Sequence, residues 1–189
     1  MAMESITLQT KRLTLKTLDE SYAVRVCAFY ERNKKHLEPW EPARAEGFYT
    51  PELQAQYLAD DMRKMMDGRM KKFWLFEKID TALQNVIGSV SLNEIVRGCF
   101  LSCFIGYRIA AGHTNRGLMS EAVSAAVDHA FNDLHLHRVE ANVIPRNIAS
   151  LRVAEKCGFT NEGLARQYLK IHGVWEDHVH MVRLNVGME

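Results

Sequence analysis

The stretch that decides the fold spans residues 104–131, FIGYRIAAGHTNRGLMSEAVSAAVDHAF. Its first six residues are mostly apolar and predict a strand. From Leu118 onward, apolar residues recur at spacings of three and four, which predicts an amphipathic helix that begins near Gly117 or Leu118. A short polar loop, residues 113–117, joins the strand to the helix.

This loop is a candidate phosphate-binding site. The first amides of a helix have no partners within it, and the helix dipole adds partial positive charge there. Gly117 would let a phosphate approach the backbone closely, and Arg116 adds a cation. An ordinary strand-to-helix turn would look the same. The sequence contains neither the P-loop pattern GxxxxGK[ST] nor the dinucleotide pattern GxGxxG.

A second stretch, residues 139–159, reads VEANVIPRNIASLRVAEKCGF. It predicts a strand that ends at Ile144, followed by a proline break and a short helix over residues 148–156. Asn147 is the expected N-cap of this helix, and Gly158 is the expected C-cap.

Together the two stretches resemble the Gcn5-related N-acetyltransferase (GNAT) superfamily. The closer resemblance is to the ribosomal-protein-alanine N-acetyltransferases, the RimJ/RimL group. It implies one N-acetyltransferase domain over residues 1–189 with the acyl-CoA N-acyltransferase fold, an α/β (α+β) architecture whose mixed, mostly antiparallel central sheet has helices on both faces. The segments that carry it cover nearly the whole chain: HLEPWEP (36–42), VRGCF (96–100), IGYRI (105–109), RGLMSEA (116–122), NIAS (147–150), KCGF (156–159) and YLKIHGVWEDHV (168–179).

Composition limits the possible partners. The chain has 189 residues, 47% of them hydrophobic and 25% charged, with a net charge of +1. Such a balance favours one globular domain and gives no strong field to attract nucleic acid or a membrane. No apolar run is long enough to span a membrane, and no signal-peptide core is present. The four cysteines have no metal or disulfide spacing, so we expect a reduced, cytoplasmic protein.

The remaining elements follow from periodicity, caps and turns, in the order βααβββαβαββ. Two prolines around Trp40 predict an extended, stiff loop over residues 36–42. Asp19 and Thr50 are expected to start helices that reach about residues 35 and 68. The predicted strands span residues 6–17 (bent near residue 10), 71–78, 86–97, 99–109, 137–144, 159–171 and 174–185.

The resemblance implies a binding site for acetyl-CoA and no metal. The loop would meet the pyrophosphate, the preceding strand would offer backbone groups to the pantetheine amides, and Asn147 would reach the pantetheine arm or act only as an N-cap. The implied cofactor-binding residues are Tyr107, Arg108, Ile109, Thr114, Asn115, Arg116, Gly117, Leu118, Met119, Asn147 and Ser150.

Three loop residues, Thr114, Asn115 and Met119, depart from the superfamily pattern Q/R-x-x-G-x-G/A. Asparagine tolerates a positive φ better than most residues, so Asn115 is expected to take the place of a glycine. These departures leave a weaker cofactor site, or an acyl-CoA-binding module without activity, as alternatives to a competent enzyme.

The catalytic groups are less well defined. Ala154 stands where many superfamily members carry a tyrosine acid. Ser150 occupies the position where, in the RimL-like branch, a serine lies by the thioester sulfur, so it is a candidate partner of the thiolate as well as a candidate capping residue. Tyr168 is the alternative acid. The glutamate base of that branch aligns near Leu169 and is not carried over.

Glu94 and Asp177 are candidate bases and substrate contacts, although each would also suit a plain surface position. Trp40 is either a lid on the core or a substrate wall, and Trp175 is either a substrate rim or a hairpin-stabilising aromatic. Without a dedicated base, an N-terminal α-amine with a pKa of roughly 7.7–8.0 suits the site better than a lysine at about 10.4.

We therefore expect an acetyl-CoA-dependent N-acetyltransferase that acts on a primary amine. The preferred acceptor is the N-terminal α-amine of a protein such as a ribosomal protein, and the alternative is a small-molecule amine. The protein would act as a monomer or homodimer, without direct contact to nucleic acid or membrane.

Overall fold

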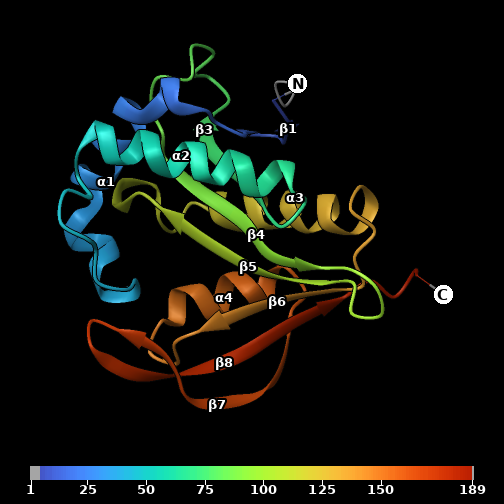
Figure 1. The fold of residues 1–189 in the computed structure, drawn as a ribbon. Helices are drawn as coiled ribbons and strands as arrows, with labels where there is room; N and C mark the ends of the chain where they lie inside the picture. The colour runs from blue at the N-terminus through green and yellow to red at the C-terminus, as the bar shows by residue number, and fades with distance from the viewer. Residues whose placement is uncertain (1–4, 189) are drawn as a thin grey trace.

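The computed structural model describes residues 5–188. They form an eight-stranded sheet in the order β1-β2-β3-β4-β5-β6-β8-β7, in which the pair β5–β6 is parallel and the other pairs are antiparallel (Figure 1). The strands are β1 Thr7–Gln9, β2 Leu13–Lys16, β3 Lys71–Glu77, β4 Gly88–Val96, β5 Ser102–Ile109, β6 Arg138–Val143, β7 Thr160–Ile171 and β8 Val174–Leu184; the α-helices are α1 Ala23–Leu37, α2 Pro51–Met66, α3 Leu118–Asn132 and α4 Ile148–Lys156.

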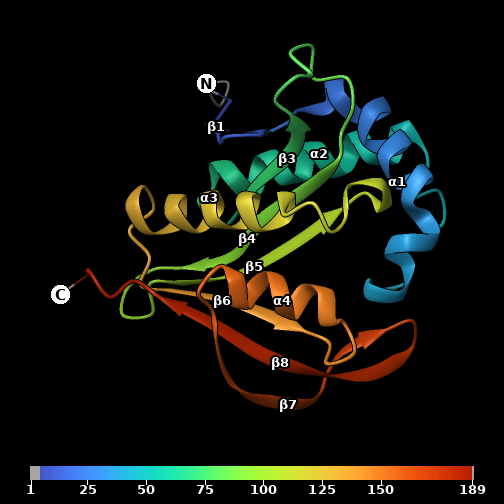
Figure 2. The same cartoon turned by 180° about the vertical axis from the view of Figure 1, so that it is seen from behind.

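Helices cover both faces of the sheet, as the sequence predicted. Successive residues of a strand point to opposite faces. On β3, Phe73 and Leu75 join the core beneath α3 and α4, whereas Trp74 and Phe76 join the core beneath α1 and α2. Figures 1 and 2 show these two layers from opposite sides. The mixed, mostly antiparallel fold class is therefore confirmed.

The parallel pair β5–β6 is joined over three residues only. Ser102–Phe104 pair with Arg138–Glu140, and the pairing between the two strands ends there. Beyond that point β5 remains paired with β4 up to Ile109, and β6 remains paired with β8 up to Val143. The carboxyl ends of β5 and β6 therefore diverge, and their facing backbone groups are left outside the ladder.

Two expectations near the N-terminus are wrong. Residues 6–17 are not one bent strand but a hairpin, in which Leu8 pairs with Leu15 and the amide of Thr10 donates to the carbonyl of Leu13 at 3.0 Å. Apolar and polar residues alternate in the same way in both arms of the hairpin. Periodicity alone therefore could not distinguish one bent strand from two strands joined by a turn. In addition, Asp19 caps a 3-10 turn, Glu20–Tyr22, that precedes α1.

The expected extended loop at residues 36–42 is also wrong in its first half. Helix α1 continues to Leu37, and a 3-10 turn, η2 (Glu38–Trp40), follows it. Pro39 occupies an early position of this turn, where its missing N–H removes no hydrogen bond and its fixed φ suits a helical turn. The chain becomes extended at Glu41.

Candidate functional site

The loop before α3 leaves the first backbone amides of that helix without hydrogen-bond partners within the helix. Asn115 adopts φ 57°, the positive value that its side chain tolerates, and Gly117 adopts φ 72° as the N-cap of α3. No side chain caps this helix, whose first internal hydrogen bond runs from the amide of Glu121 to the carbonyl of Gly117 at 3.2 Å. The amides of residues 118–120 therefore have no partners within the helix, which is the arrangement that binds phosphate oxygens.

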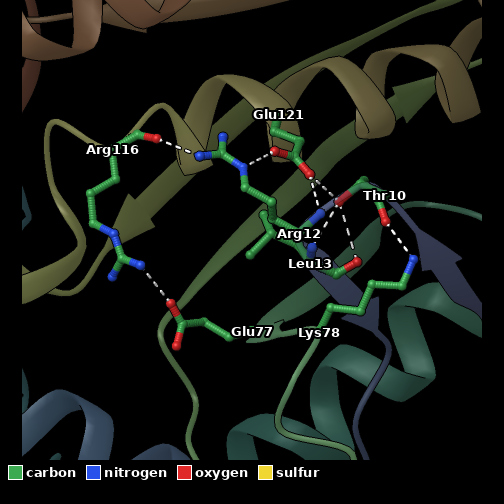
Figure 3. Close-up of polar contacts among 7 residues, drawn as sticks. All are labelled: Thr10, Arg12, Leu13, Glu77, Lys78, Arg116 and Glu121. Atoms are coloured by element: carbon green, nitrogen blue, oxygen red, sulfur yellow. Dashed lines mark hydrogen bonds and ion pairs between the residues drawn. The ribbon is translucent and has the colours of Figure 1, made fainter.

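The loop is braced by Arg12, which lies between β1 and β2 (Figure 3). Its Nε donates to Glu121 Oε2 at 2.7 Å and its Nη1 to the carbonyl of Arg116 at 2.8 Å. The backbone amide of Arg12 and the hydroxyl of Thr10 both donate to the other carboxylate oxygen, at 2.7 and 2.6 Å. Although burial alone would raise it, these hydrogen bonds hold the pKa of Glu121 below its ordinary value.

Two guanidinium groups thus flank the loop. Arg116 Nη2 contacts Glu77 Oε1 at 3.0 Å, and the Nη2 atom of Arg12 lies 3.5 Å from the position that a Cβ on Gly117 would take. A side chain on Gly117 would therefore be strained and would meet the brace. Sequence analysis missed Arg12 because its partner is 109 residues away in the chain.

On the same face of the sheet as α3, helix α4 presents Ser150 to Tyr107. Asn147 caps α4, accepting from the amide of Ser150 at 3.1 Å, as predicted. Ser150 Oγ donates to the Tyr107 hydroxyl at 3.0 Å, and that hydroxyl donates to the Ser150 carbonyl at 3.0 Å. Burial raises the pKa of Tyr107 to about 12, in spite of the opposing bond from Ser150. Tyr107 is therefore a neutral phenol that orients Ser150.

Arg108, next to Tyr107 on β5, points to the opposite face of the sheet. Its Nη1 donates to the hydroxyl of Tyr30 on α1 at 2.6 Å, and its Nε lies 3.1 Å from Glu41 Oε1. A cavity of about 440 Å³ opens on this face between α1, η2 and the following segment. Its lining is mixed in charge: Glu38, Glu41 and Glu46 lie there with Lys34, Arg44 and His172, and Glu41 is paired with Arg44.

η2 is attached to the C-terminal hairpin and to the loop after β6. His172 Nε2 lies 2.8 Å from the Glu38 carbonyl. Arg146 pairs with Glu176 at 2.9 Å and lies 5.5 Å from the centre of the Trp40 ring. Trp40, which is 36% exposed, therefore lies beside the ends of β6 and β8. It stays a predicted substrate contact.

The other predicted acceptor-side residues are dispersed. Glu94 is exposed at a bulge of β4, next to the pair Asn93–Phe104, so it lies about 10–13 Å along the sheet from Tyr107 at roughly 3.3 Å per residue. Asp177 Oδ1 accepts from the amide of Gln167 at 2.8 Å and so holds a bulge of β7. Trp175 is 56% exposed near the tip of the same hairpin.

Tyr168 lies within a polar cluster on β6, β7 and β8. Its hydroxyl accepts from Asn142 Nδ2 at 3.3 Å, and its ring packs against His178 and His180 with centroid distances of 5.6 and 4.9 Å. Burial, and then the charge of Glu140, raise the pKa of Tyr168, which keeps it a proton donor at neutral pH. Within residues 5–188, no group of three or more His, Cys, Asp or Glu side chains could hold a metal ion.

Comparison with known proteins gives a consistent result. The pattern of the acetyltransferase (GNAT) domain family matches residues 12–160. The probable N-acetyltransferase YjcK of Bacillus subtilis is 39% identical over 94% of this chain and 97% of its own length. The [ribosomal protein uS5]-alanine N-acetyltransferase of Escherichia coli is 34% identical over 92% of this chain and 88% of its own length.

Solved structures agree with the sequence relatives. The ribosomal-protein-S5-alanine acetyltransferase of Vibrio fischeri superimposes with a TM-score of 0.90 at 32% identity, over 97% of this chain and 99% of that one. RimJ of Mycobacterium smegmatis, solved in complex with CoA-disulfide, has a TM-score of 0.89 at 24% identity, over 98% and 89% of the two chains. By its sequence and fold, this chain belongs to the acetyltransferase (GNAT) domain family and is an N-acetyltransferase.

Proposed function

We propose that this protein transfers the acetyl group of acetyl-CoA to the N-terminal α-amine of a protein such as a ribosomal protein. One observation carries the proposal: the open, arginine-flanked start of α3 lies beside two strands that diverge at their carboxyl ends. Relatives named ribosomal-protein-alanine acetyltransferases support the acceptor class, and a RimJ solved with a CoA derivative supports the cofactor.

The residues at this place fit acetyl-CoA, which supplies the acetyl group as a thioester. The free amides at the start of α3 suit the pyrophosphate, with Arg12 and Arg116 adding positive charge. The unpaired end of β5 offers backbone groups to the pantetheine amides. Thr114, Met119 and Asn147 border these two regions and stay proposed cofactor contacts.

Ser150 is the proposed partner of the departing thiolate. Its hydroxyl is directed at Tyr107 in this structure. A rotation of that hydroxyl alone would turn the proton toward a sulfur atom in the gap, because Asn147 fixes the Ser150 backbone. Tyr168 remains the alternative acid. Trp40, Glu94, Trp175 and Asp177 stay proposed acceptor contacts.

Calorimetry tests the cofactor site. We expect micromolar binding of acetyl-CoA by the wild type, loss of binding in Gly117→Trp, and weaker binding in Asn147→Ala. The matched control is Gly187→Trp, because Gly187 lies near the C-terminus and a Cβ there would meet only one side-chain atom, of Asn185, at 3.8 Å. No binding by the wild type at millimolar acetyl-CoA would refute the cofactor assignment.

Acceptor identity is tested separately, by thiol release with peptides that begin with different residues. N-terminal peptides should be acetylated, and the same peptides with a blocked N-terminus and a free lysine should not. The reason is the larger neutral fraction of an α-amine at pH 7, given a pKa of roughly 7.7–8.0 against about 10.4 for lysine.

A small amine is the second candidate acceptor, and one feature favours it. In the cavity of about 440 Å³, Glu38 and Glu46 could contact a compact cation, whereas Glu41 is paired with Arg44 and Arg108, and Lys34 also lines the wall. The net charge of +1 also gives no general attraction to a ribosome. A kcat/KM for a polyamine above that of every N-terminal peptide would favour this candidate.

A further inference from the structure

The chain that follows α1 has no buried side chain to hold it in place. Leu37 ends α1 in the core and Phe48 is buried again, but every residue of the η2 segment between them (residues 38–47) is exposed or half-buried. The 3-10 turn in this segment closes with a long hydrogen bond, from the amide of Glu41 to the carbonyl of Glu38 at 3.4 Å. Apolar burial and backbone bonding therefore fix the segment weakly, and its position depends on side-chain contacts.

Open space lies on two sides of the η2 segment. Glu41 lines the cavity of about 440 Å³, and Arg108 lines a second cavity of about 360 Å³. Tyr30 and Arg44 line both cavities. Packing on either side therefore leaves the segment room to move once its side-chain contacts are removed.

Arg108 supplies the contact between this segment and the sheet. From β5, its Nη1 donates to the Tyr30 hydroxyl at 2.6 Å, and its Nε lies 3.1 Å from Glu41 Oε1 as an ion pair rather than a hydrogen bond. The side chains of Arg108 and Glu41 are 26% and 13% exposed, so water screens their attraction only in part. Arg44 pairs with the same carboxylate and lies over the Phe48 ring at 4.2 Å. Glu41 is thus held between two guanidinium groups.

Arg146 holds the opposite side of the same turn. It donates to the Pro39 carbonyl at 3.4 Å, and its guanidinium lies 5.5 Å from the centre of the Trp40 ring. Arg108 stands one residue before the end of β5, and Arg146 stands three residues beyond the end of β6. The turn that carries Trp40, between Pro39 and Glu41, is therefore attached to both of the strands that diverge.

We propose that the side chain of Arg108 is a positioning group for the acceptor: through Glu41 it fixes Trp40 at the ends of β5 and β6. This inference rests on the proposed function, in which Trp40 contacts the acceptor. The backbone of Arg108 stays a proposed contact of the cofactor, so the side chain has a separate task. Because both contacts come from one residue, the cofactor and the Trp40 ring keep a fixed distance, which is what orients an amine toward a thioester.

Peptide kinetics test the proposal with Arg108→Gln beside Arg138→Gln. The control is matched, because Arg138 also lies on a strand, is 30% exposed and pairs with a carboxylate, Glu140, that is 11% exposed. We expect Arg108→Gln to raise the KM for an N-terminal peptide about tenfold with kcat within about threefold, and Arg138→Gln to behave as wild type. Calorimetry should give both variants the wild-type affinity for acetyl-CoA.

The substitution of Arg108 is mild for the fold. Glu41 keeps Arg44 as a partner when Arg108 is replaced, so no carboxylate is left without a counter-ion. Arg108→Lys keeps the charge but lacks the fork that reaches Tyr30 and Glu41 together. We therefore expect its KM to lie between those of wild type and Arg108→Gln, whereas loss of folded protein would lower kcat and leave KM unchanged.

A double-mutant comparison identifies the group through which Arg108 acts. Once Trp40→Ala has removed the ring, adding Arg108→Gln should raise the KM little further. Losses that multiply in the double variant would mean that Arg108 binds the acceptor directly, and would overturn the inference. An unchanged KM in Arg108→Gln, or an equal rise in Arg138→Gln, would overturn it as well. Wild type that binds acetyl-CoA but acetylates no amine overturns the proposed function itself, a distinguishable result.

A spectroscopic measurement needs no turnover. In protein labelled with fluorotryptophan, the fluorine resonance of Trp40, assigned with Trp40→Phe, should shift or broaden in Arg108→Gln. The resonance of Trp175, which lies near the tip of the β7–β8 hairpin, should stay as in wild type. An unchanged Trp40 resonance would show that Arg108 does not fix the ring, and would contradict the inference whatever the acceptor is.

Discussion

Arg12 is the residue on which the shape of the proposed cofactor loop (residues 113–117) depends. It joins the turn between β1 and β2 to both ends of the loop–helix junction, through the carbonyl of Arg116 and the carboxylate of Glu121. In doing so it leaves part of its guanidinium beside Gly117. One side chain thus both shapes the backbone and adds charge where a pyrophosphate would bind.

We predict that Arg12→Gln weakens acetyl-CoA binding about tenfold and raises its KM, with kcat changed less. A hydrogen bond to a charged group contributes about 1.5–3 kcal/mol, and Arg12 is partly exposed, which favours the lower end. Calorimetry and initial rates measure both effects. Arg69→Gln is the control, since Arg69 pairs with Asp67 at an exposed site away from the loop. Equal effects of the two variants would contradict the assignment.

Tyr107 makes the free energy of unfolding depend on pH in the alkaline range. Its pKa rises from 10.0 to about 12 because burial disfavours the phenolate. Between these values the folded state binds more protons than the unfolded state, so the free energy of unfolding falls as pH rises from 10 to 12. Two pKa units correspond to about 2.7 kcal/mol as an upper bound.

Tyr107→Phe should therefore flatten this pH dependence. We expect wild type to lose about 1–2 kcal/mol more than Tyr107→Phe between pH 9 and pH 11 in urea unfolding, because only the wild type must ionise this buried phenol. Cys103, whose pKa is also raised to about 12 by burial, is present in both proteins and cancels in the difference. Parallel curves for the two proteins would show that Tyr107 does not titrate in this range.

Among the elements, the hairpin β7–β8 carries two of the four proposed acceptor contacts, Trp175 and Asp177. It has a bulge between Ala165 and Leu169, where Gln167 adopts φ 49°. The carboxylate of Asp177 holds the bulge through the amide of Gln167. The bulge determines where Tyr168 points, and hence how the hairpin faces the site.

Substitution of Asp177 separates its structural role from a role as base. Asn keeps the side-chain oxygen that accepts from Gln167 but does not accept a proton, whereas Ala removes both functions. We expect Asp177→Asn to remain within about threefold of wild-type kcat, and Asp177→Ala to lose about 1 kcal/mol of stability, the usual contribution of such a bond. A large loss of kcat in Asp177→Asn would instead identify Asp177 as a base.

At the scale of the whole molecule, the sheet separates two candidate binding faces. The loop before α3 and helix α4 lie on one face, and Arg108 and the cavity beside α1 lie on the other. None of the helices in the described part of the chain is long and apolar enough to cross a membrane.

Binding where β5 and β6 diverge should stabilise the entire fold. At 100 times its Kd, acetyl-CoA contributes about 2.7 kcal/mol, which for a chain of this size raises Tm by roughly 5–10 °C. Differential scanning fluorimetry should show this shift in wild type and in Gly187→Trp, and no shift in Gly117→Trp. A shift that survives in Gly117→Trp would place the cofactor elsewhere.

Local signals in the sequence were sufficient for most elements and for the conformation of the loop before α3. Apolar periodicity defined α3, the Asn147 cap defined the start of α4, and Asn115 and Gly117 marked the positive φ values of the loop before α3. These features depend on neighbours within a few residues, so a single sequence contains them. Where two conformations share one local pattern, as in the hairpin at residues 7–16, the prediction was wrong.

Which distant residues meet could be learned only from the folded chain. Arg12 contacts Glu121 on α3, and Tyr107 contacts Ser150 across the gap between strands. Sequence motifs were enough for the family and for the conformation of the loop before α3. Long-range pairing established the brace and the orientation of the hydroxyl pair, because those contacts depend on how the strands and helices pack rather than on spacing along the chain.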